Sequence, residues 1–408
     1  MANILNSVRV FGRISSLDGL KLLPAAVNTS VTQKAKLHSV KDTVNPLPAS
    51  QYPPWDYINN PYRWFHQFYE HTTKRLDENS KIIIVEGNIG TDKVRVGKKI
   101  ADEFGMLFLP DVPEEAIFVN ENGFDQRELN PRLGEDRFYD LKDLYTAKRP
   151  QDILGFGRTQ LEMFKRRFFN YNLALRHLLN TGQGVVIERS YWSDRCFADA
   201  MSKCGYFTRE GKTYYNKVYK QPQYVWMPHV VLYIDASVDQ CKELIKKRNK
   251  PIEKDSPLLT DQYLQTIEDT YKTKVLPRFK IWGEVLTYDL DEVENMDEIV
   301  FEMQKLNLEP PNKIDKLKFL DWYEDKEWKW NYLRQMTATD YVYDRKFFMG
   351  MEDPFLSPEI CIQDHDNYDL VVNCHPSNYW EKGFSPDTVD HMFKRQTLAN
   401  NRFQKVTA

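Results

Sequence analysis

The stretch EGNIGTDKVR, residues 86–95, decides the fold expected for this chain. It follows the apolar run 82–85, Ile-Ile-Ile-Val, which is typical of a buried strand. Against the pattern G-x-x-x-x-G-K-[ST], Gly87 and Lys93 occupy the expected positions, and Gly90 adds a second glycine. In such a loop, backbone N–H groups and a helix N-terminus converge on a phosphate. The stretch therefore predicts a strand, a phosphate-binding loop and a helix in succession.

Two residues of this loop depart from the pattern. Asp92 stands where the second glycine of the motif belongs, and Val94 where a metal-binding hydroxyl belongs. A carboxylate ~4 Å from a bound anion would repel it by about 4 kcal/mol at an effective dielectric constant near 20. The loop thus indicates descent from a nucleotide-binding protein, and it argues against phosphoryl transfer.

Apolar runs alternate with helical stretches on both sides of the loop. Candidate strands occupy residues 81–85, 106–109, 184–188, 229–235 and 284–289. The periodicity predicts a long helix over 152–182, ended by Gly182, and a second over 261–282, interrupted by Pro277. This alternation favours an α/β, P-loop kinase-like three-layer fold with a five-stranded parallel sheet. Ligands of such folds bind beyond the carboxyl ends of the strands.

Both ends of the chain differ from this central region, residues 78–308. Residues 1–41 contain a single acid, Asp18, among basic, serine and small apolar residues, which predicts a mitochondrial transit peptide over residues 1–42. A merely disordered tail is the alternative. The segment 43–77 begins with residues 43–62, which are rich in proline and aromatic residues, and helical periodicity covers 63–80. We expect a docking segment there and an aromatic, charged extension over 309–408, although their rings could equally pack on their own domain.

The composition excludes several classes of function. Fifty-six basic and fifty-nine acidic residues give a formal net charge of -3, so no nucleic-acid partner is expected. Five cysteines without C-x-x-C spacing read as reduced thiols, and no metal site is expected. Apolar runs are too short for a membrane span.

Three further motifs carry candidate functional residues. Glu188 and Arg189 end the strand in GVVIERSYWSDR, residues 184–195, where a substrate would bind, but such a pair can also tie a strand to the next helix. The basic run 242–254 suits a lid over phosphates or a solvated helix face. Gln160 could read a base edge, although exposed helical glutamines without such a role are commoner.

The order of these motifs resembles the deoxynucleoside kinase family, over about residues 78–305. In that family a helix glutamine reads the base and the arginine of E-R-S serves the reacting end of the sugar. The family's general base is a glutamate after the second strand, where FLPDVPEE offers Asp111, or Glu114 and Glu115 out of register. The resemblance implies a nucleotide-binding set of Gly87, Asn88, Gly90, Lys93, Tyr145, Gln160, Glu188, Arg189, Arg248, Lys250 and Glu253.

Together, the leader, the altered loop and the long extension resemble the nucleoside-kinase-like accessory subunits of mitochondrial respiratory complex I. This resemblance implies a matrix-side protein that has other complex I subunits as partners, supports assembly or stability, and catalyses nothing itself. It leaves a bound nucleotide open. Flavin (FAD) is implied only remotely, because the sequence has no G-x-G-x-x-G fingerprint. An active mitochondrial deoxynucleoside kinase is the alternative.

Overall fold

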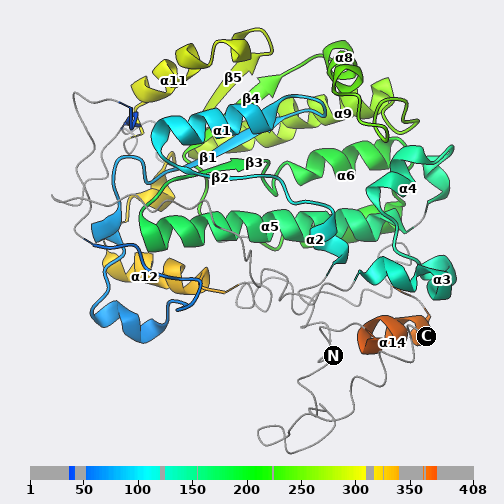
Figure 1. Ribbon diagram of the computed structural model, residues 1–408, viewed down its shortest axis with the longest axis horizontal. Coiled ribbons are helices and arrows are strands. Elements are labelled where there is room, and N and C mark those ends of the chain that lie inside the picture. Colours follow the sequence, from blue (N-terminus) through cyan, green and yellow to red (C-terminus); the bar gives the residue numbers. More distant parts are fainter. Residues whose placement is uncertain are drawn as a thin grey trace, which may run out of the picture.

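Five parallel strands form the central sheet of the computed structural model (Figure 1). Their order is β2-β3-β1-β4-β5, so β1 lies in the middle, beside β3 and β4. The α/β fold and all five strands predicted from the sequence are confirmed, with small shifts at the strand ends. The strands are β1 (Ile82–Gly87), β2 (Leu107–Leu109), β3 (Val185–Glu188), β4 (Val230–Asp235) and β5 (Glu284–Asp289). The structure describes residues 36–41, 52–119, 125–153, 155–222, 225–308, 317–324, 326–339, 362 and 364–374.

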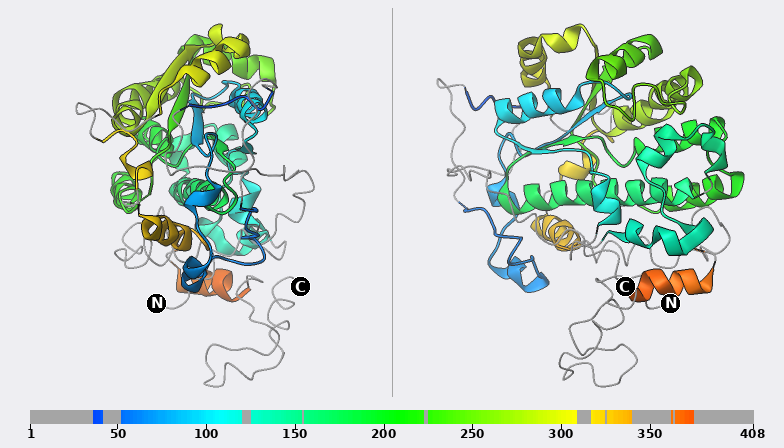
Figure 2. Two further views of the ribbon diagram at one scale, coloured as in Figure 1. Left: turned by 90° about the vertical axis from the view of Figure 1, so that its left-hand side faces the viewer. Right: turned by 45° about the vertical axis from the view of Figure 1, so that its right-hand side comes forward.

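Helices cover both faces of the sheet (Figures 1 and 2). Successive β1 residues point to opposite faces: Ile82 and Ile84 join one apolar core, and Ile83 and Val85 join the other. The second core contains α1 (Lys93–Phe104) and α11 (Met296–Lys305). The first core contains α5 (Phe156–Thr181), α6 (Asp194–Lys203), α7 (Arg209–Tyr219), α9 (Asp261–Thr270) and α10 (Leu276–Trp282).

Shorter elements connect and flank these layers. Helix α8 follows β4, and most of the others lie between β2 and α5. They are α2 (Glu115–Phe118), α3 (Asn130–Leu133), α4 (Leu141–Thr146), α8 (Val238–Arg248), and the 3-10 helices η4 (Gln126–Leu129), η5 (Gly134–Asp136), η6 (Pro150–Asp152) and η8 (Glu292–Glu294).

The helical stretch 261–282 contains the interruption that Pro277 predicted. A π-helical turn, η7 (Tyr271–Val275), separates α9 from α10, and Pro277 lies in the first turn of α10. A proline cannot donate a backbone hydrogen bond to the preceding turn, so the chain widens there. The wide turn holds the buried ring of Tyr271 against the site described below.

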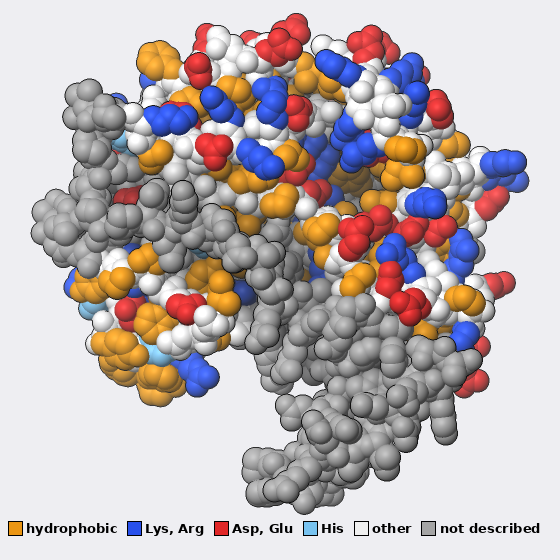
Figure 3. Space-filling model, viewed as in Figure 1, with side chains coloured by type: hydrophobic (Ala, Val, Ile, Leu, Met, Phe, Trp, Pro, Cys, Tyr) orange, Lys and Arg blue, Asp and Glu red, His pale blue; other side chains and the backbone are white. Residues whose placement is uncertain are grey.

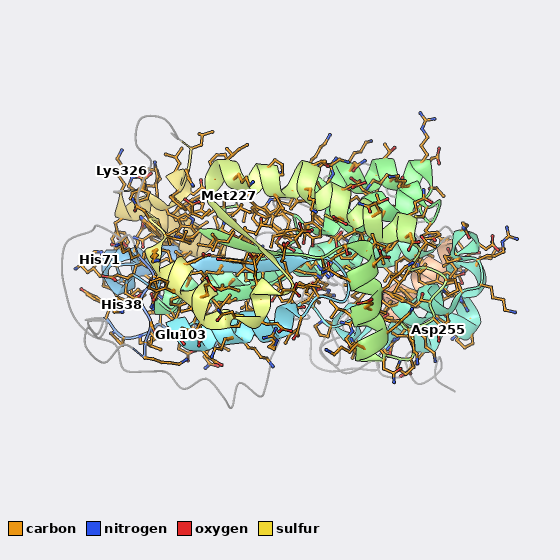
Figure 4. All side chains as sticks on the ribbon, turned by 90° about the horizontal axis from the view of Figure 1, so that it is seen from above. His38, His71, Glu103, Met227, Asp255 and Lys326 are labelled. Atoms are coloured by element: carbon orange, nitrogen blue, oxygen red, sulfur yellow. The ribbon has the colours of Figure 1, made fainter. Side chains whose placement is uncertain are left out.

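Segments from the two ends of the chain pack on each other beside the carboxyl end of α5. They are η2 (Trp64–Phe68) and η3 (Thr73–Arg75) from one end, and η9 (Leu320–Trp322) and α12 (Glu327–Met336) from the other. Thr72 donates its backbone N–H to Glu327 and its hydroxyl to Asn331. Figure 4 shows His71 and Lys326 at one end of the molecule and Asp255, in the loop after α8, at the opposite end.

The single helix expected over residues 63–80 is wrong, because only the two short 3-10 helices form there. Thr72 is fully buried, and its polar groups bond to α12 instead of to the preceding turn. These distant contacts replace the regular helical hydrogen bonds that the apolar periodicity suggested.

Part of the predicted transit peptide lies within the described residues. Leu37 is buried in the α1 core, and Ser39 and Lys41 both bond to the carboxylate of Glu103 on α1. The remaining residues 1–35 and 42 lie outside the described residues, as does most of the extension after 339. One further helix is described there, α14 (His365–Cys374). Among the described helices, none is long and apolar enough to cross a membrane.

Candidate functional site

The backbone of the loop after β1 follows the path of a phosphate-binding loop. It runs from Gly87 to Asp92, and α1 begins at Lys93. Gly90 has a φ of 94°, and a Cβ there would lie 3.0 Å from the backbone oxygen of Cys241. Both the left-handed backbone and the close approach of α8 require glycine at this position.

Lys93 is folded onto its own loop. Its Nζ donates to the backbone oxygen of Asn88 at 3.0 Å, and to the backbone oxygen and Oγ1 of Thr91 at 3.3 Å and 3.0 Å. The side chain is buried. Burial, followed by the nearby charge of Arg189, lowers the pKa of Lys93 to about 7. Lys93 therefore lies in the loop with its ammonium bonded to oxygens of Asn88 and Thr91. A bound phosphate would compete with these oxygens for the ammonium.

Asp92 and Val94 are both partly exposed, and both line the cavity described below. The Asp92 carboxylate accepts from Nε of Arg95 at 2.7 Å, and both side chains are half exposed. Arg95 therefore offsets part of the repulsion that the sequence predicted between Asp92 and an anion. The Thr91 hydroxyl donates to the Asn88 backbone oxygen, so it does not replace the hydroxyl missing at Val94.

Arg189 is held at the carboxyl end of β3 in a left-handed conformation, with a φ of 60°. Its Nη1 donates to the Tyr271 hydroxyl at 3.2 Å, and that hydroxyl donates to Glu86 at 3.0 Å. Its Nε lies 3.5 Å from the Asp111 carboxylate. A non-glycine residue at positive φ costs about 1–3 kcal/mol and occurs where the surroundings dictate the backbone. The guanidinium of Arg189 is thus fixed in place at the carboxyl end of the sheet.

A buried ion network lies beside Arg189. Arg167 of α5 binds Asp111 through Nε and Nη2 at 2.9 Å and 2.7 Å, and Asp194 through Nη1 at 2.6 Å. Asp194 also accepts from Gln160 at 3.0 Å and from the Tyr215 hydroxyl at 2.5 Å. Gln160 is therefore buried and not an exposed helical glutamine without a role: Asp194, which is itself held by Arg167, orients its amide.

The pKa values of the two carboxyl groups in this network, Asp111 and Asp194, are shifted in opposite directions. Burial opposes ionisation of both. At Asp111 the charges of Arg167 and Arg189 outweigh burial, and the pKa falls below its usual value. At Asp194 burial dominates over Arg167, and the pKa is raised.

The loop after α8 closes the other side of the site. Arg248 and Lys250 both pair with Glu253, the second at 3.7 Å. The Ser256 hydroxyl donates to the backbone oxygen of Tyr145 at 2.7 Å, which ties this loop to α4. Burial, followed by the charge of Glu253, raises the pKa of Tyr145 to about 12. Figure 3 shows Lys and Arg side chains gathered at the end of the molecule that carries α8.

These elements enclose one cavity of about 680 Å³ beyond the carboxyl ends of the strands. Of the residues predicted from the sequence, two stay in the loop at its base: Gly87 and Asn88, whose amide donates to the Leu264 backbone oxygen. The structure brings the others together around the cavity: Gly90, Lys93, Tyr145, Gln160, Glu188, Arg189, Arg248, Lys250 and Glu253.

Sequence reasoning missed the residues that orient the predicted ones: Arg167, Asp194, Tyr215 and Tyr271. Arg167 follows Gln160 by seven positions, so both lie on one face of α5 and the spacing was a usable signal. Asp194 follows the predicted strand 184–188 by six positions and begins α6. No local pattern distinguishes Tyr215 or Tyr271.

Lys93 should make stability depend on pH. Its folded-state pKa of about 7 lies below that of the unfolded chain, so the unfolded state binds more protons and stability rises with pH above about 7. We expect the free energy of unfolding to rise by about 1–3 kcal/mol more in the wild type than in Lys93→Met over about two pH units above neutrality. Urea denaturation at several pH values measures this. Lys98→Met, at an exposed lysine of the same helix, is the control and should follow the wild type; equal slopes for Lys93→Met and wild type would refute the expectation.

Comparisons with known proteins agree with this geometry. A model of the deoxynucleoside kinase family matches residues 83–308. Subunit 10 of the NADH dehydrogenase (ubiquinone) 1 alpha subcomplex, mitochondrial, from Mus musculus is 33% identical over 324 residues, which cover 78% of this chain and 85% of that protein. Deoxyguanosine kinase from Dictyostelium discoideum is 25% identical, over 68% of this chain and 87% of its own length.

A solved structure is also similar. Deoxyadenosine kinase from M. mycoides with bound dATP covers 54% of this chain and 97% of its own, with 16% sequence identity and a TM-score of 0.39.

Proposed function

The chain belongs to the deoxynucleoside kinase family, and from this premise we propose that it is a non-catalytic accessory subunit of mitochondrial NADH dehydrogenase, respiratory complex I. The observation that carries the proposal is the 33% identity to the mouse subunit over most of both chains. The protein would act in the matrix, on the inner face of the inner membrane, among other complex I subunits. Its role there would be to support assembly or stability of the complex.

The state of the site supports a role without catalysis. Phosphoryl transfer needs a metal ion held near the phosphates and a base that takes the proton of the attacking hydroxyl. Val94 supplies no metal-binding hydroxyl. Asp111 is held in a bidentate pair with Arg167, and the Glu114 carboxylate accepts the backbone N–H of Leu141. Two of the three carboxylates that the sequence offers after β2 are thus already engaged.

The cavity itself supports retention of a nucleotide. Gln160 and Arg167 offer a polar edge for a base, while Lys93, Arg189 and Arg248 supply positive charge at the phosphate side. A subunit that holds a nucleotide without converting it would gain stability from the bound ligand.

The packing of residues 36–41 on α1 bears on the leader. Leu37 is buried and Lys41 bonds to Glu103, so these residues belong to the folded domain. The proposed cleavage of a transit peptide would then fall before residue 36.

Migration on a native gel tests the main proposal. Solubilised mitochondria that contain the tagged protein should show it in the large NADH-oxidising complex, detected by in-gel activity and immunoblot. Migration only as a small free species, with the complex intact, would overturn the proposal.

Binding of a nucleotide would stabilise the purified protein. We expect saturating ligand, at a hundredfold excess over its dissociation constant, to add about 2.7 kcal/mol to the free energy of unfolding. Thermal unfolding with each deoxynucleoside triphosphate, with and without Mg²⁺, measures the effect, and Arg189→Met should abolish it. No shift with any nucleotide, together with no nucleotide in an acid extract of the native protein, would remove this part of the proposal.

An active deoxynucleoside kinase is the second candidate, favoured by the similarity to Dictyostelium deoxyguanosine kinase and by Lys93 in its motif position. Labelled ATP with the four deoxynucleosides decides between them. We expect no product above that of a Lys93→Ala control; clear turnover that this substitution removes would establish the kinase.

A further inference from the structure

Six exposed aromatic side chains form a patch at the end of the molecule opposite the cavity. Trp64, Phe65, Phe68 and Tyr69 come from η2 and the residue after it, and Trp328 and Tyr332 from α12. Their exposed fractions range from 39% for Phe65 to 74% for Phe68. We call these six residues the aromatic face. Figure 3 shows hydrophobic side chains gathered at the lower left, over η2. Monomeric proteins rarely leave such a patch in water without a partner.

The two halves of the aromatic face sit on one rigid base. The inward side of α12 carries Glu327, Asn331 and Arg334, spaced at i, i+4 and i+7. Glu327 and Asn331 bond to Thr72, and Arg334 reaches the Glu70 carboxylate at 3.4 Å. Trp328 and Tyr332 lie one position further round the same helix, and α12 packs against η2. The two helices that carry the exposed rings are therefore neighbours on one base.

The exposed rings also have fixed orientations. Trp64 packs edge-on against Phe65 and Phe68, with ring centroids 6.1 Å and 6.0 Å apart. Lys329 lies over the ring of Trp328 at 5.8 Å. Rings held in this way lose little conformational entropy on binding, which suits recognition of a partner of defined shape.

The charge around the aromatic face is mainly positive. The carboxylates nearby are used internally: Glu70 by Arg75 and Arg334, Glu327 by Thr72 and Thr73. Two buried arginines thus share the single carboxylate of Glu70, which leaves positive charge beneath the face. Among the described residues, the exposed cations Arg63, Lys74 and Lys326 have no acidic partner; Lys74 contacts only Tyr52.

We propose that the aromatic face is the surface through which this chain docks on a neighbouring protein subunit, whose matching surface is apolar and edged by carboxylates. The inference rests on the proposed function, since it supplies the contact by which an accessory subunit would be held. Tryptophan, tyrosine and arginine dominate the energy of protein interfaces. An anionic bilayer would also attract aromatic and basic residues, but it does not need rings fixed on a rigid base.

Incorporation into the complex tests the aromatic part. In cells that lack the endogenous protein, the double variant Trp64→Ala/Phe68→Ala should reduce the fraction that migrates with the large complex about ten-fold or more. The matched control is Phe301→Ala, an equally exposed ring on α11 that is not part of the face. It should migrate like the wild type. Purified variants should keep wild-type unfolding temperatures, because the removed rings are exposed.

Charge reversal gives a second, independent variant. Arg63→Glu/Lys74→Glu should also lower incorporation, and the loss should shrink as salt is raised. The control Lys98→Glu/Lys280→Glu makes the same change in net charge at exposed lysines elsewhere and should have no effect.

The outcomes separate this inference from the function on which it rests. Wild-type protein that never migrates with the complex overturns the function and the inference together. Wild-type protein that migrates with it while both face variants do so equally overturns only the inference. Face-dependent sedimentation of the purified protein with phosphatidylglycerol vesicles, with incorporation unaffected, would replace the protein partner by a membrane surface.

Discussion

Replacing Arg167 by methionine is expected to lower the free energy of unfolding by about 3–5 kcal/mol, because it leaves the buried Asp194 and the partly buried Asp111 without their shared cation. Arg167 is almost fully buried and binds Asp111 and Asp194 at once. Urea denaturation of the purified protein measures the loss. Arg149→Met removes a surface pair with Asp152 and should cost less than about 1 kcal/mol.

Two further variants show whether unpaired charge is the cause. Arg167→Met combined with Asp194→Asn should recover much of the stability, since the buried Asp194 charge is then removed and Asp111 keeps Arg189 at 3.5 Å. In the single variant, Asp194 loses the cation that favours its ionised form, so its pKa, already raised, rises further. The folded state then binds more protons than the unfolded state, and stability falls as pH rises. A deficit that is equal in acid and at neutral pH would contradict this account.

Gly182→Ala is expected to be the second severe substitution, with a loss of about 3 kcal/mol or more. Gly182 ends α5 with a φ of 80°, which alone costs alanine about 1–2 kcal/mol. A Cβ at this position would also lie 2.0 Å from the backbone oxygen of Arg75. Relief of that contact requires the N-terminal segment to move away from α5.

Gly205→Ala is the matched control for this substitution. Gly205 has a φ of 74°, but its Cβ would meet only Gln151 Cγ, at 3.9 Å. It should therefore show the backbone cost of about 1–2 kcal/mol and no more. Equal losses in thermal or urea unfolding for the two variants would mean that the contact with Arg75 is not tight.

The comparison of these glycines illustrates what the sequence could predict. Gly182 was recognisable as the end of a long helix, because a glycine follows the last periodic residue. Its contact with Arg75, more than a hundred positions earlier in the chain, has no local signature. The five strands were predictable for a similar reason: each is a short, continuous apolar run with turn residues or charges at its ends.

The candidate site divides along the same line. Arg189 follows β3 directly and Lys93 begins the helix after β1, so the parallel fold places both at the carboxyl end of the sheet. The network of Arg167 and Asp194 depends on how α5 and α6 pack on each other, which spacing alone does not determine. The failed helix over 63–80 has the same origin, because α12, far along the chain, supplies the hydrogen bonds that ended it.

The seam between the two ends of the chain also constrains the order of events during biogenesis. Thr72 and Glu327 are 255 positions apart, and Glu70 and Arg334 are 264 apart. The N-terminal segment is synthesised early but gains its contacts with α12 late. The residues between the two segments must first be synthesised and close a large loop. Until then the pair of Glu70 and Arg75 lacks Arg334, the second arginine, and helix α12, which covers the pair. A chain cut short before α12 would expose this unfinished edge, which is the kind of surface by which proteases and chaperones distinguish incomplete proteins from complete ones.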